Sequence, residues 1–329
     1  GTYAFNLVVI TIFLAPIIFK FMIKFSKKIL LICLISLFFF SNYIYGSFII
    51  NKNTAINNYV KKEDKAYVKV ISPNFDLKYY SSLEEIKNKL KRLIKYSEPE
   101  QDKKTLFVWP EGIFTGYSYE EISEFKNMIE KSFSKKHLIL FGINTTNPET
   151  GEYFNSLIVV NNKFEVIETY NKKKLVPFGE FIPFEKFLSF LGLKKITQGY
   201  TSFSKGQISK IINLEKINLL PLICYEIIFP ELIQNNKKES NLIVNISEDG
   251  WFGNSIGPHQ HYAKAIFRSI ENDTYLVRSA NKGISAIINN KGEVIKKLKS
   301  YEAGSIDMHI PLLQPKYKNK NDLIFFILL

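Results

Sequence analysis

The sequence contains three side-chain types that together support thiol chemistry, each beside a predicted strand or a rigid loop. Glu111 follows an apolar strand that Pro110 interrupts, and Cys224 follows a second apolar run, LLPLI. The lysine triplet 172–174 precedes a turn rich in Gly and Pro, LVPFGEFIP. A thiol is mostly protonated at neutral pH, so a catalytic cysteine needs a base or a nearby cation, and Glu and Lys supply both. Taken singly, each has a simpler interpretation: a solvated carboxylate, a buried thiol and a solvent-facing lysine triplet.

These residues need a scaffold that brings strand ends together, and the chain alternates strand-like and helix-like segments between about residues 60 and 315. This alternation predicts one α/β domain, in which the carboxyl ends of strands form the edge where sites lie. A turn at Asn161 and Asn162 predicts a hairpin. Strands are expected at 66–71, 105–109, 137–143, 154–161, 164–170, 217–224, 242–246, 275–279 and 283–288, and helices at 83–96, 120–134 and 259–271.

The composition excludes several classes of function. The 329 residues are 46% hydrophobic, too apolar for a disordered chain, and 44 Lys plus Arg against 31 Asp plus Glu give a net charge of +13. No basic motif that reads nucleic acid accompanies this charge, so we expect no nucleic-acid partner, and anionic lipid headgroups are the favoured neighbour. The two cysteines, Cys33 and Cys224, form no disulfide framework, and the absence of CxxC and HExxH strings argues against a zinc site. We predict no cofactor and no metal.

Two charge-free apolar runs, 3–19 and 29–50, come close to the roughly 20 residues that span a bilayer. Four lysines lie between them, at positions 20, 24, 27 and 28. We interpret residues 1–50 as two transmembrane helices joined by a basic cytoplasmic loop, with a signal peptide or buried core helices as alternatives. A third apolar run begins near residue 322, so the chain is expected to be a piece of a longer membrane protein, although the lysine-rich KYKNKND before this run opposes the predicted topology.

Four strings resemble a known family. WPE, YNK followed by LVPFGE, and ICYE together resemble the Glu-Lys-Cys signature of the nitrilase, or carbon-nitrogen hydrolase, superfamily. LVPFGEFIP, CYE and WFG-x-SIGP-x-QH resemble one membrane-anchored branch, the apolipoprotein N-acyltransferases. The resemblance covers nearly the whole chain. It implies a nitrilase-like α-β-β-α sandwich at 60–315, attached to transmembrane helices of the bacterial inner membrane and facing the periplasm.

The resemblance also implies an activity. An acyl chain would move from a phospholipid, through a cysteine thioester, to the N-terminal amine of diacylglyceryl-cysteine on a lipoprotein. The enzyme would be a monomer and would need no cofactor. Lys172 is favoured over its neighbours by its spacing to PFGE, and the family's WFG loop maps to residues 251–253. Carried across residue by residue, the site comprises Cys224 as nucleophile, Glu111 as general base, Lys172 as oxyanion-stabilising cation, and Glu180, Tyr225 and Glu226 as supporting residues.

The chain departs from the family pattern at residues 72–74 and at Tyr79, which concerns the lining of the acyl-donor mouth, and at Glu248, where Asn or Asp would be usual. Three other functions stay open. A membrane-anchored nitrilase-type amidase would use the same three residues to hydrolyse a small amide. A serine hydrolase would use Ser255 in the string GNSIG, although this string does not follow a strand directly. A non-enzymatic membrane protein is the third, and the intact Glu, Lys and Cys positions argue against it.

Overall fold

The computed structural model describes residues 25–52, 65–78, 81–183, 202–207, 211–234 and 239–313. The chain divides into two compact units, Gly1–Asn53 and Thr54–Leu329. In the first unit, helix α2 (Phe25–Lys52) contains the apolar run 29–50 and exposes large apolar side chains such as Leu37 and Phe40. Within the described residues, no helix is both long and apolar enough to cross a membrane, so the predicted span at 29–50 is not confirmed. The predicted spans at 3–19 and 322–329 lie outside the described residues.

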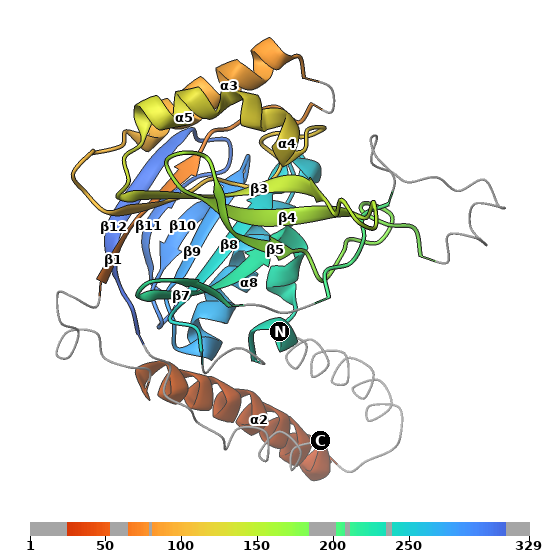
Figure 1. Cartoon of the computed structure of the whole chain (residues 1–329). Coiled ribbons are helices and arrows are strands. Elements are labelled where there is room, and N and C mark those ends of the chain that lie inside the picture. Colours follow the sequence, from red (N-terminus) through yellow and green to blue (C-terminus); the bar gives the residue numbers. More distant parts are fainter. Residues whose placement is uncertain are drawn as a thin grey trace. The chain divides into compact units, whose positions relative to one another are not determined.

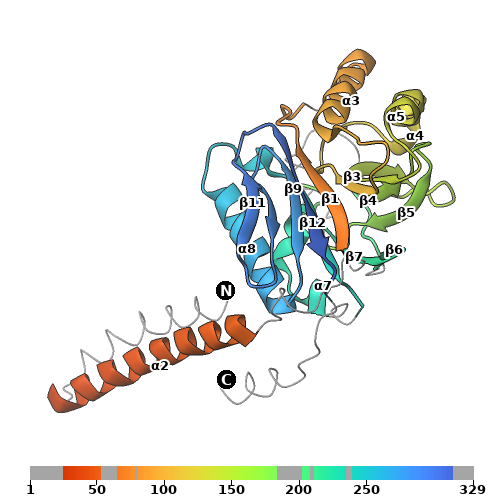
Figure 2. The same ribbon diagram turned by 90° about the vertical axis from the view of Figure 1, so that its left-hand side faces the viewer.

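The second unit is a sandwich of two sheets with helices on both outer faces (Figures 1 and 2), which confirms the predicted nitrilase-like α/β architecture. One sheet has the order β12 (Gly304–Pro311), β1 (Lys65–Ser72), β2 (Thr105–Val108), β3 (His137–Thr146), β4 (Tyr153–Val160) and β5 (Val166–Asn171). The other has the order β11 (Val294–Leu298), β10 (Ser285–Ile288), β9 (Leu276–Asn281), β8 (Leu242–Glu248), β7 (Ile217–Ile223) and β6 (Ile212–Leu214).

Each sheet has a parallel centre and antiparallel margins. Strands β1, β2 and β3 are parallel to one another, as are β7, β8 and β9. Strand β12 pairs antiparallel with β1 over its full length, from Lys65 opposite Pro311 to Ser72 opposite Gly304. Because parallel strands end at the same edge, β2 and β7 bring the residues that follow them to the carboxyl edges of the two sheets.

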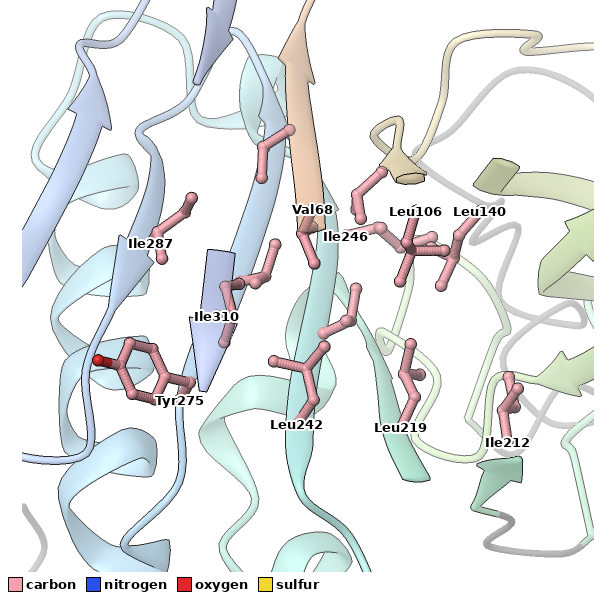
Figure 3. Close-up of a cluster of buried hydrophobic side chains, with 14 of the residues drawn as sticks. Val68, Leu106, Leu140, Ile212, Leu219, Leu242, Ile246, Tyr275, Ile287 and Ile310 are labelled. Carbon is pink, nitrogen blue, oxygen red and sulfur yellow. The ribbon is translucent and has the colours of Figure 1, made fainter. Parts of the chain in front are cut away.

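The alternation of side chains along each strand separates an inner core from an outer one. Leu106 and Val108 of β2 belong to the buried cluster between the sheets, whereas Phe107 and the next residue after the strand, Trp109, belong to the cluster beneath the helices. Figure 3 shows the inter-sheet cluster, to which strands of both sheets contribute. This core holds the two strand ends of the site in fixed positions, because close-packed interiors leave little room for movement.

Three longer helices close the sandwich. α3 (Leu83–Ser97) begins with a capping box made by Ser82 and Glu85 and, with α5 (Lys126–Ser132), covers one sheet. α8 (Gly257–Asn272) covers the other sheet. Among the described residues there are also two single-turn helices, α4 (Tyr119–Ile122) and α7 (Glu231–Gln234).

All nine predicted strands are present, but the helix predicted at 120–134 is divided. The 3-10 turn η3 (Ser123–Phe125) separates α4 from α5. Strands β6, β11 and β12 were not predicted. β6 has only three residues, most of β11 is exposed, and β12 (GSIDMHIP) mixes polar and apolar residues without a clean alternation.

Candidate active site

Glu111 is the third residue after the end of β2, and its carboxylate accepts three hydrogen bonds. Its Oε1 accepts hydrogen bonds from Asn155 Nδ2 at 2.8 Å and from Lys172 Nζ at 3.3 Å, and its Oε2 accepts from the backbone N–H of Glu248 at 3.0 Å. Gly142 on β3 permits this placement, because a Cβ there would come within 2.8 Å of the Glu111 Cα. The carboxylate is buried and fixed while it still lines a cavity.

Lys172 follows β5 and is fully buried. Its ammonium donates to Glu180 Oε1 at 2.7 Å and to Glu111 Oε1 at 3.3 Å, so two carboxylates share one cation. Burial alone would lower the pKa of Lys172, but the charges of Glu111 and Glu180 outweigh it and raise that pKa above its ordinary value. The side chain is therefore a permanent cation.

Glu180 and Asn155 close a ring of hydrogen bonds with the Lys172 ammonium and Glu111. Asn155 Nδ2 donates to both Oε1 atoms, at 2.8 Å to Glu111 and 2.8 Å to Glu180, while Glu180 Oε2 accepts from the backbone N–H of Val176 at 2.8 Å. Asn155 was not singled out in the sequence. It is the third residue of β4 and has no local motif around it, so only the pairing of strands brings it to the site.

Cys224 lies at the end of β7 and begins the 3-10 turn η4 (Cys224–Ile228). Its φ of 47° is in the left-handed region, which non-glycine residues rarely adopt and which recurs at active sites. Burial first, and the Glu111 carboxylate second, raise the pKa of the Cys224 thiol, while Lys172 opposes them. The resting group is therefore a thiol that needs a base.

Glu226 ties the cysteine turn to the lysine loop. Its Oε1 accepts from the backbone N–H groups of Lys173 at 2.7 Å and Lys174 at 3.0 Å, and its Oε2 accepts from the backbone N–H of Ile223 at 2.8 Å. The hydroxyl of Tyr170 also donates to Oε1, at 2.9 Å. Glu226 is fully buried and does not line the cavity, so it supports the site from behind.

A single cavity of about 810 Å³ brings five of the six predicted site residues together. Glu111, Lys172, Glu180, Cys224 and Tyr225 all line it, and so do Trp251 and Phe252 of the WFG string. Most of the remaining wall is apolar, including Leu77, Phe114, Ile143, Val176, Phe203 and Ile228.

Glu248, at the end of β8, is a second carboxyl group in the cavity wall. Its two oxygens accept from the backbone N–H of Gly250 and from Asn281 Nδ2, each at 2.7 Å. Burial raises its pKa well above the ordinary value, and the nearby Glu111 and Asp249 charges act in the same direction. Of the remaining departures, Ser72 is buried with its hydroxyl donating to the backbone oxygen of Glu302, and Tyr79 lies outside the described residues.

A second buried charged cluster, also not predicted, contacts the backbone of Cys224. Arg278 Nη2 donates to both carboxylate oxygens of Asp249, at 3.0 and 2.7 Å, and His261 Nε2 lies 3.0 Å from the carbonyl oxygen of Cys224. Burial would raise the pKa of Asp249, but the Arg278 charge and His261 lower it overall. In the sequence, His261 belongs to the string WFG-x-SIGP-x-QH but was given no role of its own, and Arg278 lies in no motif.

The arrangement suits acyl transfer through a thiol. A carboxylate that can accept the thiol proton and a permanent cation that can stabilise an oxyanion line the same cavity as Cys224. Ser255, the serine of GNSIG, is exposed, lies outside this cavity, and precedes α8 without following a strand. This position does not fit a nucleophile elbow.

Comparison with known proteins gives one family match. The model of the family described as carbon-nitrogen hydrolase matches residues 72–314. Among solved structures, Saccharomyces cerevisiae Nit3, a member of branch 10 of the nitrilase superfamily, superposes with a TM-score of 0.56 at 17% identity, covering 77% of this chain and 93% of Nit3. An amidase from Nesterenkonia sp. gives 0.53 at 15% identity, covering 83% and 99%. These two structures support the fold.

Curated relatives confirm the predicted resemblance to one branch. The chain is 41% identical over 156 residues to apolipoprotein N-acyltransferase of Rhizobium leguminosarum bv. trifolii, which is 47% of this chain and 29% of the relative. It is 32% identical over 211 residues to that of Brucella suis (63% and 40%) and 37% identical over 178 residues to that of Rickettsia typhi (53% and 35%). The matched part of the chain thus spans between 29% and 40% of the length of these relatives.

Proposed function

The chain belongs to the carbon-nitrogen hydrolase family, and we propose that it is an apolipoprotein N-acyltransferase that uses Glu111, Lys172 and Cys224 as its catalytic residues. The observation that carries the proposal is the cavity, in which these three side chains meet a wall that is otherwise mainly apolar. Such a wall suits a long acyl chain. The similarity to three proteins named apolipoprotein N-acyltransferase supports the same activity.

The first half of the proposed reaction forms a thioester. Glu111 takes the thiol proton as Cys224 attacks the ester carbonyl of a phospholipid. The Lys172 ammonium and a backbone N–H at the start of η4 stabilise the tetrahedral oxyanion. The oxyanion collapses and the carbon–oxygen ester bond breaks. Glu111 donates the thiol-derived proton to the departing oxygen, so the lysophospholipid leaves as an alcohol and Glu111 is again a carboxylate.

The second half transfers the acyl chain to an amine. The N-terminal amine of a diacylglyceryl-cysteine attacks the thioester carbonyl, and Glu111 accepts a proton from the attacking nitrogen. The carbon–sulfur bond breaks, an amide forms, and Cys224 is regenerated as a thiol. The proposed reaction changes no oxidation state, and Lys172 supplies the positive charge at the oxyanion, so neither half calls for a metal or a redox cofactor.

We place this activity at the outer face of the bacterial inner membrane, with the catalytic unit in the periplasm. The apolar residues before position 53, including the exposed apolar side chains of α2, would provide the membrane attachment. Confining both substrates and the site to one surface raises their effective concentration. Carbonate extraction of membranes and protease accessibility of residues 65–313 in spheroplasts test this location. A catalytic unit protected from external protease would contradict it.

The alternative is a nitrilase-type amidase, which would share Glu111, Lys172 and Cys224 and differ only in the acceptor. Hydrolysis needs water at the thioester, whereas transfer needs an amine. Incubation of the acylated protein with a diacylglyceryl-cysteine peptide separates the two, because transfer yields an N-acylated peptide and hydrolysis yields a free fatty acid.

The decisive experiment is peptide mass spectrometry after incubation with phospholipid. We expect a hydroxylamine-labile acyl mass on the peptide that contains Cys224, and its loss in Cys224→Ala. Cys33→Ala is the matched control, because it removes the other cysteine and leaves the site intact. Release of lysophospholipid without an acylated Cys224 would contradict the proposal.

A further inference from the structure

His261 on α8 contacts the backbone of the cysteine that the proposed mechanism uses. Its Nε2 lies 3.0 Å from the carbonyl oxygen of Cys224. Its Nδ1 lies 3.0 Å from Asp249 Oδ1 and 3.2 Å from Arg278 Nη2. The imidazole is buried at 6% exposure, so these contacts are not exchanged freely with water.

The hydrogen-bonding roles follow from the partners. A carbonyl oxygen can only accept, so the contact with Cys224 requires a proton on Nε2. Nδ1 has one neighbour that can only accept, Asp249, and one that can only donate, Arg278. Whether Nδ1 donates to the carboxylate or accepts from the guanidinium, Nε2 keeps its proton. The cluster therefore presents a fixed N–H donor to the Cys224 carbonyl.

The groups behind His261 are rigid. Arg278 and Asp249 are both fully buried, and Arg278 also donates through Nε to the carbonyl of Ile284 at 3.2 Å and through Nη1 to Asn245. The hydroxyl of Ser247 donates to Asp249 Oδ1 at 2.7 Å. These residues come from β8, from β9 and from the turn η5 (Asp249–Phe252) that directly follows β8, so the imidazole is oriented by buried groups at the ends of two paired strands.

The carbonyl of Cys224 shares a planar peptide unit with the N–H of Tyr225. In a trans peptide the C=O and the N–H point in opposite directions, so fixing one fixes the other. This N–H is at the start of η4, where the first N–H groups have no partner within the helix. Because Cys224 has a φ of 47°, this peptide plane needs external support to keep its orientation.

We propose that His261 is a positioning residue that holds the Cys224–Tyr225 peptide so that the Tyr225 N–H serves, with the Lys172 ammonium, as an oxyanion donor. Asp249 and Arg278 contact Nδ1 and hold the imidazole in the orientation in which the protonated Nε2 donates to the Cys224 carbonyl oxygen. This inference rests on the proposed acyl transfer at Cys224, but it concerns acylation of the thiol by any ester and not the identity of the acyl donor.

The test compares two reactions of Cys224 in the full chain in detergent micelles. Acylation by p-nitrophenyl butyrate passes through an oxyanion, whereas alkylation by iodoacetamide displaces iodide and does not. His261→Asn removes the donor to the Cys224 carbonyl, and we expect acylation to fall by about tenfold to hundredfold while alkylation is unchanged. His261→Gln carries an amide N–H near the Nε2 position, and we expect acylation within about threefold of the wild type.

Other outcomes overturn the proposal. Equal losses of acylation and alkylation would assign His261 to thiol activation or to folding, and unchanged acylation in His261→Asn would remove its role altogether. Nitrogen-15 NMR spectra of the wild type test the protonation of His261 directly. An unprotonated Nε2 would contradict the inferred hydrogen bond to the Cys224 carbonyl oxygen. The use of p-nitrophenyl butyrate also distinguishes the role of His261 from the proposed N-acyltransferase activity. The wild type can form a thioester with this activated ester even if phospholipid is not its natural acyl donor. A wild type that the ester does not acylate would overturn both.

Discussion

Two clusters of buried charged residues meet at Cys224, and they differ in their ratio of carboxylates to cations. In the first, two carboxylates, Glu111 and Glu180, share the single ammonium of Lys172, and their side chains keep 10% and 13% of their exposure at the cavity. In the second, one guanidinium, Arg278, faces one carboxylate, Asp249, and both are fully buried. The first cluster has one carboxylate more than it has cations, and the proposed reaction uses Glu111 as the proton acceptor. The matched pair of the second has no such excess and serves as support.

Removal of Lys172 should have the largest effect. Lys172→Met leaves two carboxylates facing each other without a cation, which we expect to destabilise the fold by about 3–5 kcal/mol. Acylation of Cys224 should fall by at least about a hundredfold, because the proposed mechanism loses the cation that stabilises its oxyanion. Denaturant unfolding and the p-nitrophenyl butyrate burst measure the two effects. Lys173→Met is the control, since the structure shows only the backbone of Lys173 bonded to Glu226. Near-normal acylation in Lys172→Met would refute the role of the ammonium.

Removal of a charge from the Arg278–Asp249 pair should reduce the stability of the fold, and removal of both charges should restore part of it. Arg278→Met leaves Asp249 buried without a cation, and we expect a loss of about 3–5 kcal/mol in the free energy of unfolding. The double variant Arg278→Met, Asp249→Asn removes both charges, so stability should recover in part. Urea titrations of the three proteins test this. If the double variant is no more stable than the single one, the pair is not a compensated ion pair.

The neighbours Glu248 and Asp249 should respond to pH with opposite signs. Asp249 has a lowered pKa when folded, so its contribution to stability is present above the unfolded value of about 3.9 and is lost as the pH falls. Glu248 has a raised pKa, so the unfolded chain releases its proton first. The wild type should then lose stability relative to Glu248→Gln, on the order of 1 kcal/mol, as the pH rises above about 4.3. Parallel pH profiles for the two proteins would contradict this assignment.

The smallest expected effect concerns the thiol itself. Burial and Glu111 raise the pKa of Cys224, so its alkylation by iodoacetamide should continue to increase with pH above the ordinary thiol value of about 8.5. Glu111→Gln removes a negative charge beside the thiol, and the midpoint of the pH profile should move to lower pH. An unshifted midpoint in this variant would place the Glu111 charge too far from the sulfur to matter.

Local patterns were enough to find the strand ends of the site. Pro110 marks the end of one buried strand and CYE the end of another, and the parallel pairing of these strands with their neighbours follows from their buried, continuous apolar character. The choice of Lys172 came from the family resemblance, because no periodicity separates it from Lys173 and Lys174. In the structure the difference is physical: one side chain is buried among carboxylates, and the backbones of the other two bind Glu226.

The second cluster could not be found from local patterns, because its residues are separated in sequence and meet only through sheet pairing. One signal was present. Among 44 basic residues only Arg92, Arg268 and Arg278 are arginines. An arginine in a buried strand of a lysine-rich chain indicates a site that needs several hydrogen-bond donors in a fixed plane. The guanidinium of Arg278 provides these donors, and a lysine ammonium would not. The pairing of β12 with β1 is similarly beyond local reasoning, because more than 230 residues separate Ser72 from Gly304.

The antiparallel pairing of β12 with β1 brings the two ends of the sandwich close together. Lys65 at the start of β1 lies opposite Pro311 at the end of β12, so the chain enters and leaves the sandwich at neighbouring points. A folded unit whose two ends are adjacent can be inserted between two segments of another protein without separating those segments. It should also accept circular permutation, with a short linker joining residues 65 and 311 and new ends opened at the exposed turn near Gly151.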